Sequence, residues 1–159
     1  MYGFPLTIYI ISSVFGASIG FSAAEGHLLA NLLARLGIWD LNTGVLVVMM
    51  LSTLIILAGF WLIGIGWQKI HKSEGLVTDG IYAHVRHPQY LGIILITLGF
   101  LIQWPTLLTL AMWPILVVMY YQLAKKEELE LETRFTKDYQ KYKHRVPMFL
   151  PSLHAKDSW

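Results

Sequence analysis

Residues that could do chemistry lie close together in the segment GLVTDGIYAHVRHPQYLG, which covers residues 75–92. Arg86 and His87 come directly before Pro88, and Tyr90 follows within one turn. Proline is favoured in the first turn of a helix, where backbone N–H groups lack partners and favour a negatively charged group. The sequence therefore predicts that Arg86 and His87 stand at the mouth of a helix, where an anion could bind.

The same segment also has a purely structural interpretation. Arg86 could extend to lipid phosphates, and His87 could cap the helix. Gly92 and Gly99 are seven residues apart and fall on nearly one face of the helix, where they either leave room for a ligand or form a helix-packing seam. His84 lies three residues before His87, but no third ligand has suitable spacing, so no metal is expected.

A second candidate group is the glutamate pair Glu127 and Glu128, which follows an uncharged stretch ending at Leu123. A carboxylate this close to a membrane boundary is costly unless it has a partner or faces a polar cavity. Further along, a helical stripe predicts an amphipathic helix lying against the bilayer. The stripe consists of Leu131, Phe135, Tyr139 and Tyr142. Such a helix explains the basic residues of this segment better than it explains the two glutamates.

The elements that must position these residues are hydrophobic. The chain has 159 residues, of which 55% are hydrophobic and 14% are charged, whereas soluble domains carry about a quarter charged residues. It has no cysteine, which excludes disulfides and thiolate metal sites. The composition predicts an all-α membrane protein whose partner is the lipid bilayer and not nucleic acid.

Three apolar stretches without Asp, Glu, Lys or Arg cover residues 4–21, 45–67 and 90–123. A helix needs about 20 residues to cross the hydrocarbon layer, so the third stretch is too long for one crossing. Gln103-Trp104-Pro105 divides it with a polar residue, an interfacial aromatic and a helix-starting proline. We predict one domain, residues 1–159, with transmembrane helices at 4–21, 45–67, 88–103 and 105–123 and a cytoplasmic segment at 124–151. A short amphipathic helix is expected around residues 28–36.

The basic residues predict the orientation. Arg35 is the only Lys or Arg before Lys69, and the other eleven of the twelve follow. Cytoplasmic loops carry an excess of Lys and Arg, so the segments after the second and fourth spans should face the cytoplasm. An even number of spans then places both termini there. We expect a multi-pass protein, in the cell membrane of a prokaryote.

Three ordered elements resemble a known family. They are the pattern G-x-Y-x-x-x-R-H-P-x-Y-x-G in residues 80–92, the paired glutamates, and the ending F-x-x-x-Y-x-x-Y-x-x-x-V-P in residues 135–147. Together they resemble the isoprenylcysteine carboxyl methyltransferase family. They are also similar to the wider group of small integral-membrane methyltransferases that includes phospholipid N-methyltransferases. The resemblance covers about half of the chain, from residue 75 to residue 151.

The resemblance implies that S-adenosylmethionine lies in a pocket closed by the C-terminal segment. A carboxylate can accept hydrogen bonds from ribose hydroxyls and favours a sulfonium cation, while an aromatic ring can stack on adenine. The candidate cofactor-binding residues are His87, Tyr90, Gly92, Gly99, Glu127 and Glu128.

The same resemblance implies that a small lipophilic methyl acceptor, a carboxylate, thiol or amine, enters from the bilayer. Arg86 and His87 are the candidate catalytic residues. The planar donor fork of Arg86 suits a carboxylate of the acceptor or of the cofactor. A neutral amine or thiol must lose a proton, for which His87 or a glutamate is a candidate.

Two other functions remain open on the sequence alone. Membrane sterol reductases share a similar R-H-P-x-Y and Y-x-x-Y-x-x-x-V-P arrangement but use NADPH. A non-catalytic membrane assembly or transport protein could also be built on the same scaffold. The segment Leu123-Ala124-Lys125-Lys126 departs from the eukaryotic methyltransferases, which carry an arginine before a longer acidic run. The arginine of that family therefore has no counterpart here. Because the chain is short and no prenylated partner is evident, a small lipophilic acid, thiol or amine is expected as much as a prenylated protein.

Overall fold

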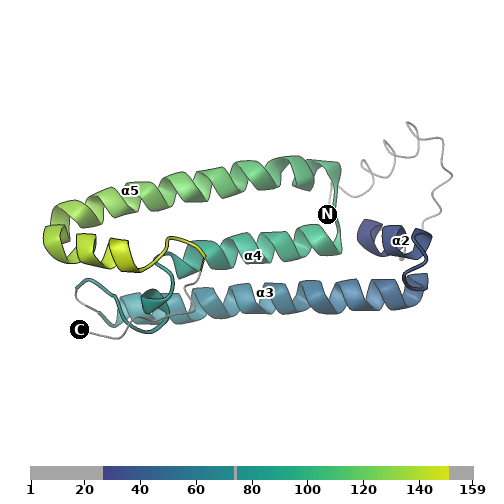
Figure 1. Cartoon of the computed structure of the whole chain (residues 1–159), viewed down its shortest axis with the longest axis horizontal. Coiled ribbons are helices and arrows are strands. Elements are labelled where there is room, and N and C mark those ends of the chain that lie inside the picture. The colour runs from purple at the N-terminus through teal and green to yellow at the C-terminus, as the bar shows by residue number, and fades with distance from the viewer. Residues whose placement is uncertain (1–26, 74, 151–159) are drawn as a thin grey trace. The chain divides into compact units, whose positions relative to one another are not determined.

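The computed structural model describes residues 27–73 and 75–150. These residues form α-helices and one 3-10 helix, without a strand in either described range (Figure 1). The elements are α2 (Leu28–Arg35), α3 (Leu41–His71), η2 (Gly80–Ala83), α4 (Pro88–Gln103) and α5 (Leu107–Arg145). The all-α prediction is therefore confirmed for the described part of the chain. The predicted first span, residues 4–21, lies outside it.

The described residues fall into two compact units. Unit 1 contains residues 27–56 and 97–115, and unit 2 contains residues 57–96, without residue 74, and residues 116–150. The helices α3, α4 and α5 each contribute to both units. All the polar candidate residues lie in unit 2. The prediction of one domain over residues 1–159 stays a prediction.

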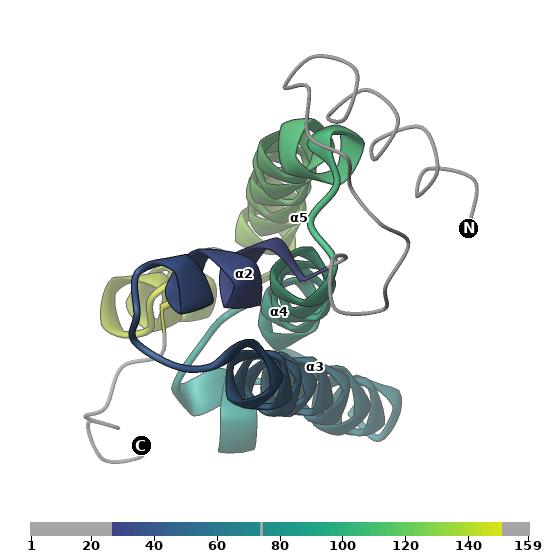
Figure 2. The same ribbon diagram turned by 90° about the vertical axis from the view of Figure 1, so that its right-hand side faces the viewer.

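In unit 1, α2 packs beside the start of α3 and the end of α4 (Figure 2). Ala30 is fully buried and faces Gly44 of α3, where a Cβ atom would lie 3.4 Å from the carbonyl oxygen of Ala30. The buried His27 donates a hydrogen bond of 2.9 Å from Nδ1 to the carbonyl oxygen of Gln103. The short helix expected around residues 28–36 is thus present as α2, while its place at the membrane interface stays a prediction.

Two helices, α3 and the Leu108–Arg145 part of α5, are long and apolar enough to cross a membrane. Only 22% of the most apolar window of α3 and 6% of that of α5 is buried within the protein. Large apolar side chains such as Met50, Trp61 and Met119 are exposed instead. Their length and this exposure fit membrane-spanning helices, because large exposed apolar surfaces are rare on soluble proteins.

The predicted boundaries of the spans agree with the helix boundaries of the structure only in part. Helix α3 contains the predicted span 45–67 and extends beyond it at both ends, and α4 has the predicted bounds 88–103. The predicted fourth span, 105–123, overlaps a longer helix. Helix α5 begins two residues later, at Leu107, and continues to Arg145. No helix end separates the apolar part of α5 from the charged part that follows. The number of membrane crossings stays a prediction.

The face of α4 that carries Gly92 and Gly99 packs against α3. In unit 2, a Cβ atom on Gly92 would lie 2.6 Å from the backbone oxygen of Gly59, and in unit 1 a Cβ atom on Gly99 would lie 2.9 Å from that of Ser52. Close backbone approach is the usual function of small residues between membrane helices. Both glycines therefore lie in a packing seam with α3, and their predicted role in cofactor binding stays a prediction.

This packing predicts a stability change on substitution. Gly92→Ala should lower the free energy of unfolding by about 1–3 kcal/mol, because the added methyl group overpacks a contact with rigid backbone. Gly64→Ala is the matched control on α3, where a Cβ atom would meet nothing within 4 Å. The control should be neutral or slightly stabilising, since alanine favours a helix over glycine. Thermal unfolding in detergent compares the two, and an equal effect of both substitutions would contradict the seam.

Candidate functional site

The R-H-P turn is built by local sequence signals in unit 2. Gly80 has a φ of +64°, a conformation that favours glycine, and it starts the 3-10 helix η2. Pro88 then begins α4, and the carbonyl oxygen of His87 accepts a hydrogen bond of 3.0 Å from the N–H of Leu91. The structure therefore places Arg86 and His87 at the mouth of α4, as predicted from the sequence.

The backbone of this turn is bound to the segment that follows α5. The N–H of Arg86 donates to the carbonyl oxygen of Pro147 at 3.0 Å, and the N–H of His87 donates to that of Met148 at 3.2 Å. These two donors are therefore satisfied within the protein and are not available to an anion. The V-P ending of the sequence pattern and the Met148 that follows it are thereby attached to the R-H-P stretch, about 60 residues earlier in the chain.

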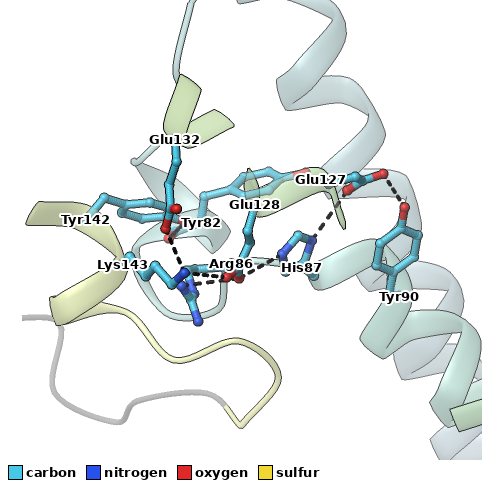
Figure 3. Close-up of polar contacts among 9 residues, drawn as sticks. All are labelled: Tyr82, Arg86, His87, Tyr90, Glu127, Glu128, Glu132, Tyr142 and Lys143. Atoms are coloured by element: carbon cyan, nitrogen blue, oxygen red, sulfur yellow. Dashed lines mark hydrogen bonds and ion pairs between the residues drawn. The ribbon is translucent and has the colours of Figure 1, made fainter. Parts of the chain in front are cut away.

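The buried Glu128 carboxylate is surrounded by the side chains of Arg86, His87 and Lys143 (Figure 3). The Glu128 side chain is 2% exposed. Its Oε1 atom lies 3.2 Å from Nη1 of Arg86 and 3.2 Å from Nε2 of His87, and its Oε2 atom lies 3.3 Å from Nζ of Lys143. The carboxylate that was expected to need a partner thus has three.

Glu127 occupies a different environment from its neighbour. Its side chain is 48% exposed. One carboxylate oxygen accepts a hydrogen bond from the Tyr90 hydroxyl, and the other lies 3.6 Å from Nδ1 of His87. Glu127 therefore presents a carboxylate that is held in place by two side chains and still reaches the surface.

His87 lies between the two glutamates. Its ring is 7% exposed and stacks on Tyr90 at a centroid distance of 5.6 Å and an interplanar angle of 10°. Phe149 lies against the ring at 6.1 Å. Nε2 makes a hydrogen bond of 3.2 Å with Glu128, whereas Nδ1 lies 3.6 Å from Glu127, which is too long for a hydrogen bond. The geometry makes His87 the link between the buried and the exposed carboxylate.

A bend in α5 completes the site. Thr136 has non-helical backbone angles, and after it the last turns of α5 run back beside the preceding turns (Figure 1). Tyr139, Tyr142 and Val146 form a small core with Leu76, Leu131 and Phe135. The stripe predicted to face the bilayer as one helix instead packs on itself. Lys143 thereby reaches Glu132 at 2.7 Å.

Tyrosine hydroxyls connect this core to the R-H-P turn. The hydroxyl of Tyr142 donates to the carbonyl oxygen of Tyr82 at 2.7 Å, and the hydroxyl of Tyr82 donates to that of Gly66 on α3 at 3.4 Å. Burial, with a smaller contribution from the charge of Glu127, raises the pKa of Tyr82 to about 12. Its hydroxyl therefore remains a neutral donor at physiological pH.

The structure brings together five of the seven candidate residues. Arg86, His87, Tyr90, Glu127 and Glu128 are connected by the contacts above, whereas Gly92 and Gly99 face α3. Lys143, Glu132 and Phe149 were not among the residues predicted from the sequence. Phe149 lies within residues 75–151, which the family resemblance covers, but Lys143 and Glu132 carried no signal beyond their charge.

The chain is similar in sequence to methyltransferases in two separate comparisons with known proteins. The family model for phospholipid methyltransferases matches residues 39–138, which is more than half of the chain. The chain is also 32% identical over 87 residues to the Protein-S-isoprenylcysteine O-methyltransferase of Schizosaccharomyces pombe. That match covers 54% of this chain and 37% of the yeast protein, so this chain spans well under half the length of that relative. No solved structure gives a significant match.

Proposed function

Because the chain belongs to the phospholipid methyltransferase family, we propose that it transfers a methyl group from S-adenosylmethionine to a small lipophilic acceptor. The observation that carries this proposal is the half-exposed Glu127 carboxylate beside the stacked rings of Tyr90 and His87. A carboxylate next to aromatic faces suits a ligand that combines hydroxyl groups, an adenine ring and a cationic centre. The sequence resemblance to methyltransferases is thus supported by an appropriate set of donors and acceptors.

The residues around Glu127 fit the proposed cofactor. Tyr120 lies 5.3 Å from Tyr90, and Tyr121 lies 6.5 Å from Phe149, measured between ring centroids. Aromatic rings from α5 therefore lie next to Tyr90, which binds Glu127, and next to Phe149, which lies against His87. S-adenosylmethionine would supply a methyl group already activated on a sulfonium. Glu127 and Tyr90 would hold the cofactor. Glu128 would keep His87 and Arg86 in position from the buried side.

The protein's contribution to the reaction is mainly alignment and exclusion of water. Methyl transfer to a carboxylate or thiolate is an in-line displacement that needs no acid or base, so positioning supplies most of the acceleration. A neutral amine or thiol must lose a proton, and His87 is the candidate to accept it. For this role His87 must be neutral, and its one N–H can then stay on Nε2, 3.2 Å from Glu128, while Nδ1 accepts the proton.

We propose further that the acceptor comes from the lipid bilayer and that both termini face the cytoplasm of a prokaryotic cell. The exposed apolar surfaces of α3 and α5 support a bilayer partner. The concentration of Lys and Arg after residue 68 supports the orientation. Single cysteines introduced at Ser73 and Ser158 should resist a membrane-impermeant thiol reagent applied to intact cells. Labelling of either cysteine from outside would contradict the orientation.

One experiment tests the activity and the acceptor class together. The purified protein is incubated with methyl-labelled S-adenosylmethionine and a panel of lipophilic acids, thiols and amines, and the label is followed into the organic phase. We expect transfer to one of these classes. Oxidation of NADPH with an unsaturated lipid, in a protein that transfers no label, would support the reductase alternative instead.

Arg86 offers a test of positioning. Lysine keeps the positive charge beside Glu128 but lacks the planar donor fork, so Arg86→Lys should fold yet align the reacting groups less well. We expect turnover to fall by about tenfold, equivalent to about 1.4 kcal/mol of barrier. The comparison uses an acceptor that supports wild-type turnover. Equal turnover and an equal Michaelis constant would show that Arg86 contributes only charge.

A further inference from the structure

Lys143 connects the two parts of α5. Its Nζ atom lies 2.7 Å from Oε1 of Glu132 and 3.3 Å from Oε2 of Glu128, both of which precede the bend at Thr136 (Figure 3). Lys143 itself lies after the bend. Ion pairs on a protein surface contribute little to stability, whereas removing one partner of a buried charge is costly because that charge is left uncompensated. The pair with Glu128 is of the second kind, because that carboxylate is buried.

The two oxygens of Glu128 have separate partners. Oε1 faces Arg86 and His87, while Oε2 faces Lys143. A planar carboxylate that is bound at both oxygens cannot rotate without losing one set of contacts. Lys143 therefore helps to determine which way the carboxylate presents Oε1 to the ring of His87.

We propose that Lys143 is a positioning residue of the site and acts through Glu128 on His87. It does not need to touch the cofactor or the acceptor. When its charge is removed, Oε2 loses its partner and the carboxylate can turn away from Nε2 of His87. His87 also faces Glu127, the carboxylate that reaches the surface, so a less ordered ring lowers the affinity for the cofactor. This consequence rests on the proposed function, whereas the effect on His87 does not.

The test compares Lys143→Met with Lys143→Arg, and uses Lys141→Met as the matched control. Lys141 is exposed and lies on the same part of α5. Binding of S-adenosylhomocysteine is measured by isothermal titration in detergent, well below the unfolding temperature. We expect Lys143→Met to weaken binding at least roughly fivefold, about 1 kcal/mol, and Lys143→Arg to stay within about twofold of wild type. Lys141→Met should leave binding unchanged.

A second measurement reports on His87 directly. In protein labelled with nitrogen-15 at histidine, the ring resonances of His87 are assigned from their loss in His87→Gln. Lys143→Met should shift them, and Lys141→Met should not. A loss of general stability without repositioning would leave these resonances in place.

Failure of the proposed role of Lys143 and failure of the proposed function would give different results. Wild-type affinity and unchanged His87 resonances in Lys143→Met would overturn the proposal, as would equal losses in Lys143→Arg and Lys143→Met. If the wild-type protein does not bind S-adenosylhomocysteine, the proposed function fails and the resonances alone decide the role of Lys143. If Lys143→Met does not purify as a folded protein, Lys143→Gln keeps a donor without the charge and is judged by the same criteria.

Discussion

Glu128→Ala should lower the free energy of unfolding by about 3–5 kcal/mol, the range for removing one partner of a buried ion pair. The side chain of Arg86 is 9% exposed and faces the Glu128 carboxylate. Without that carboxylate the guanidinium stays buried with its nearest negative charge removed, and His87 and Lys143 lose a partner as well. Denaturant unfolding in detergent measures the change.

The adjacent glutamate provides the control for this prediction. Glu127 carries the same charge one residue earlier, but its side chain is about half exposed. Pairs of this kind contribute roughly 0–1 kcal/mol, so Glu127→Ala should change the free energy of unfolding little. A similar loss of stability in both variants would contradict the division between a buried and an exposed carboxylate.

Glu127→Ala should instead weaken binding of S-adenosylhomocysteine by about 1.5–3 kcal/mol, the range for hydrogen bonds to a charged group. This loss corresponds to roughly 10- to 150-fold in the dissociation constant. The physical reason is that Glu127 is the carboxylate the site presents at its surface, where Tyr90 holds one of its oxygens. Isothermal titration measures the change in a variant whose unfolding temperature matches wild type.

Two further variants make this second prediction specific. Lys126→Ala changes a charged, exposed residue next to Glu127 and should leave the affinity unchanged. Tyr90→Phe removes the hydroxyl that orients the carboxylate and should give a smaller loss than Glu127→Ala, since the carboxylate itself remains. Unchanged affinity in Glu127→Ala would remove this residue from the binding site.

The helix that carries the R-H-P-x-Y pattern was predictable because its ends are marked by local signals. Pro88 favours the first turn of a helix, and Gln103-Trp104-Pro105 interrupts the apolar run, so the bounds of α4 follow from residue types alone. The contact between His87 and Glu128 is different, because it joins residues 41 positions apart. It depends on the alignment of α4 with α5, which no single segment specifies.

The bend at Thr136 was not predictable from the sequence. Sharp bends are usually marked by Pro or Gly, and residues 124–146 contain neither. The regular spacing of Leu131, Phe135, Tyr139 and Tyr142 therefore indicated one continuous helix. In the structure, burial of the two tyrosines against the preceding turns prevails over this local preference. The position of Lys143 beside Glu128 depends on the same bend, which explains why its sequence context gave no sign of it.

The glycines show how one pattern can fit two interpretations. Gly92 and Gly99 share a face of α4, which suits either a ligand or a neighbouring helix. The sequence cannot decide between them, because the occupant of that face comes from α3, more than 30 residues earlier. In the structure the nearest atoms belong to α3. The packing of α3 on this face therefore favours the helix-seam interpretation, while cofactor binding by the two glycines stays a prediction.

Titration of S-adenosylhomocysteine into the wild-type protein in detergent tests the central claim most directly, because it requires no knowledge of the methyl acceptor. The account predicts saturable binding with one molecule per chain, displaced by S-adenosylmethionine and weakened in Glu127→Ala. An absence of binding to folded protein, with binding of NADPH at the same site, would contradict it.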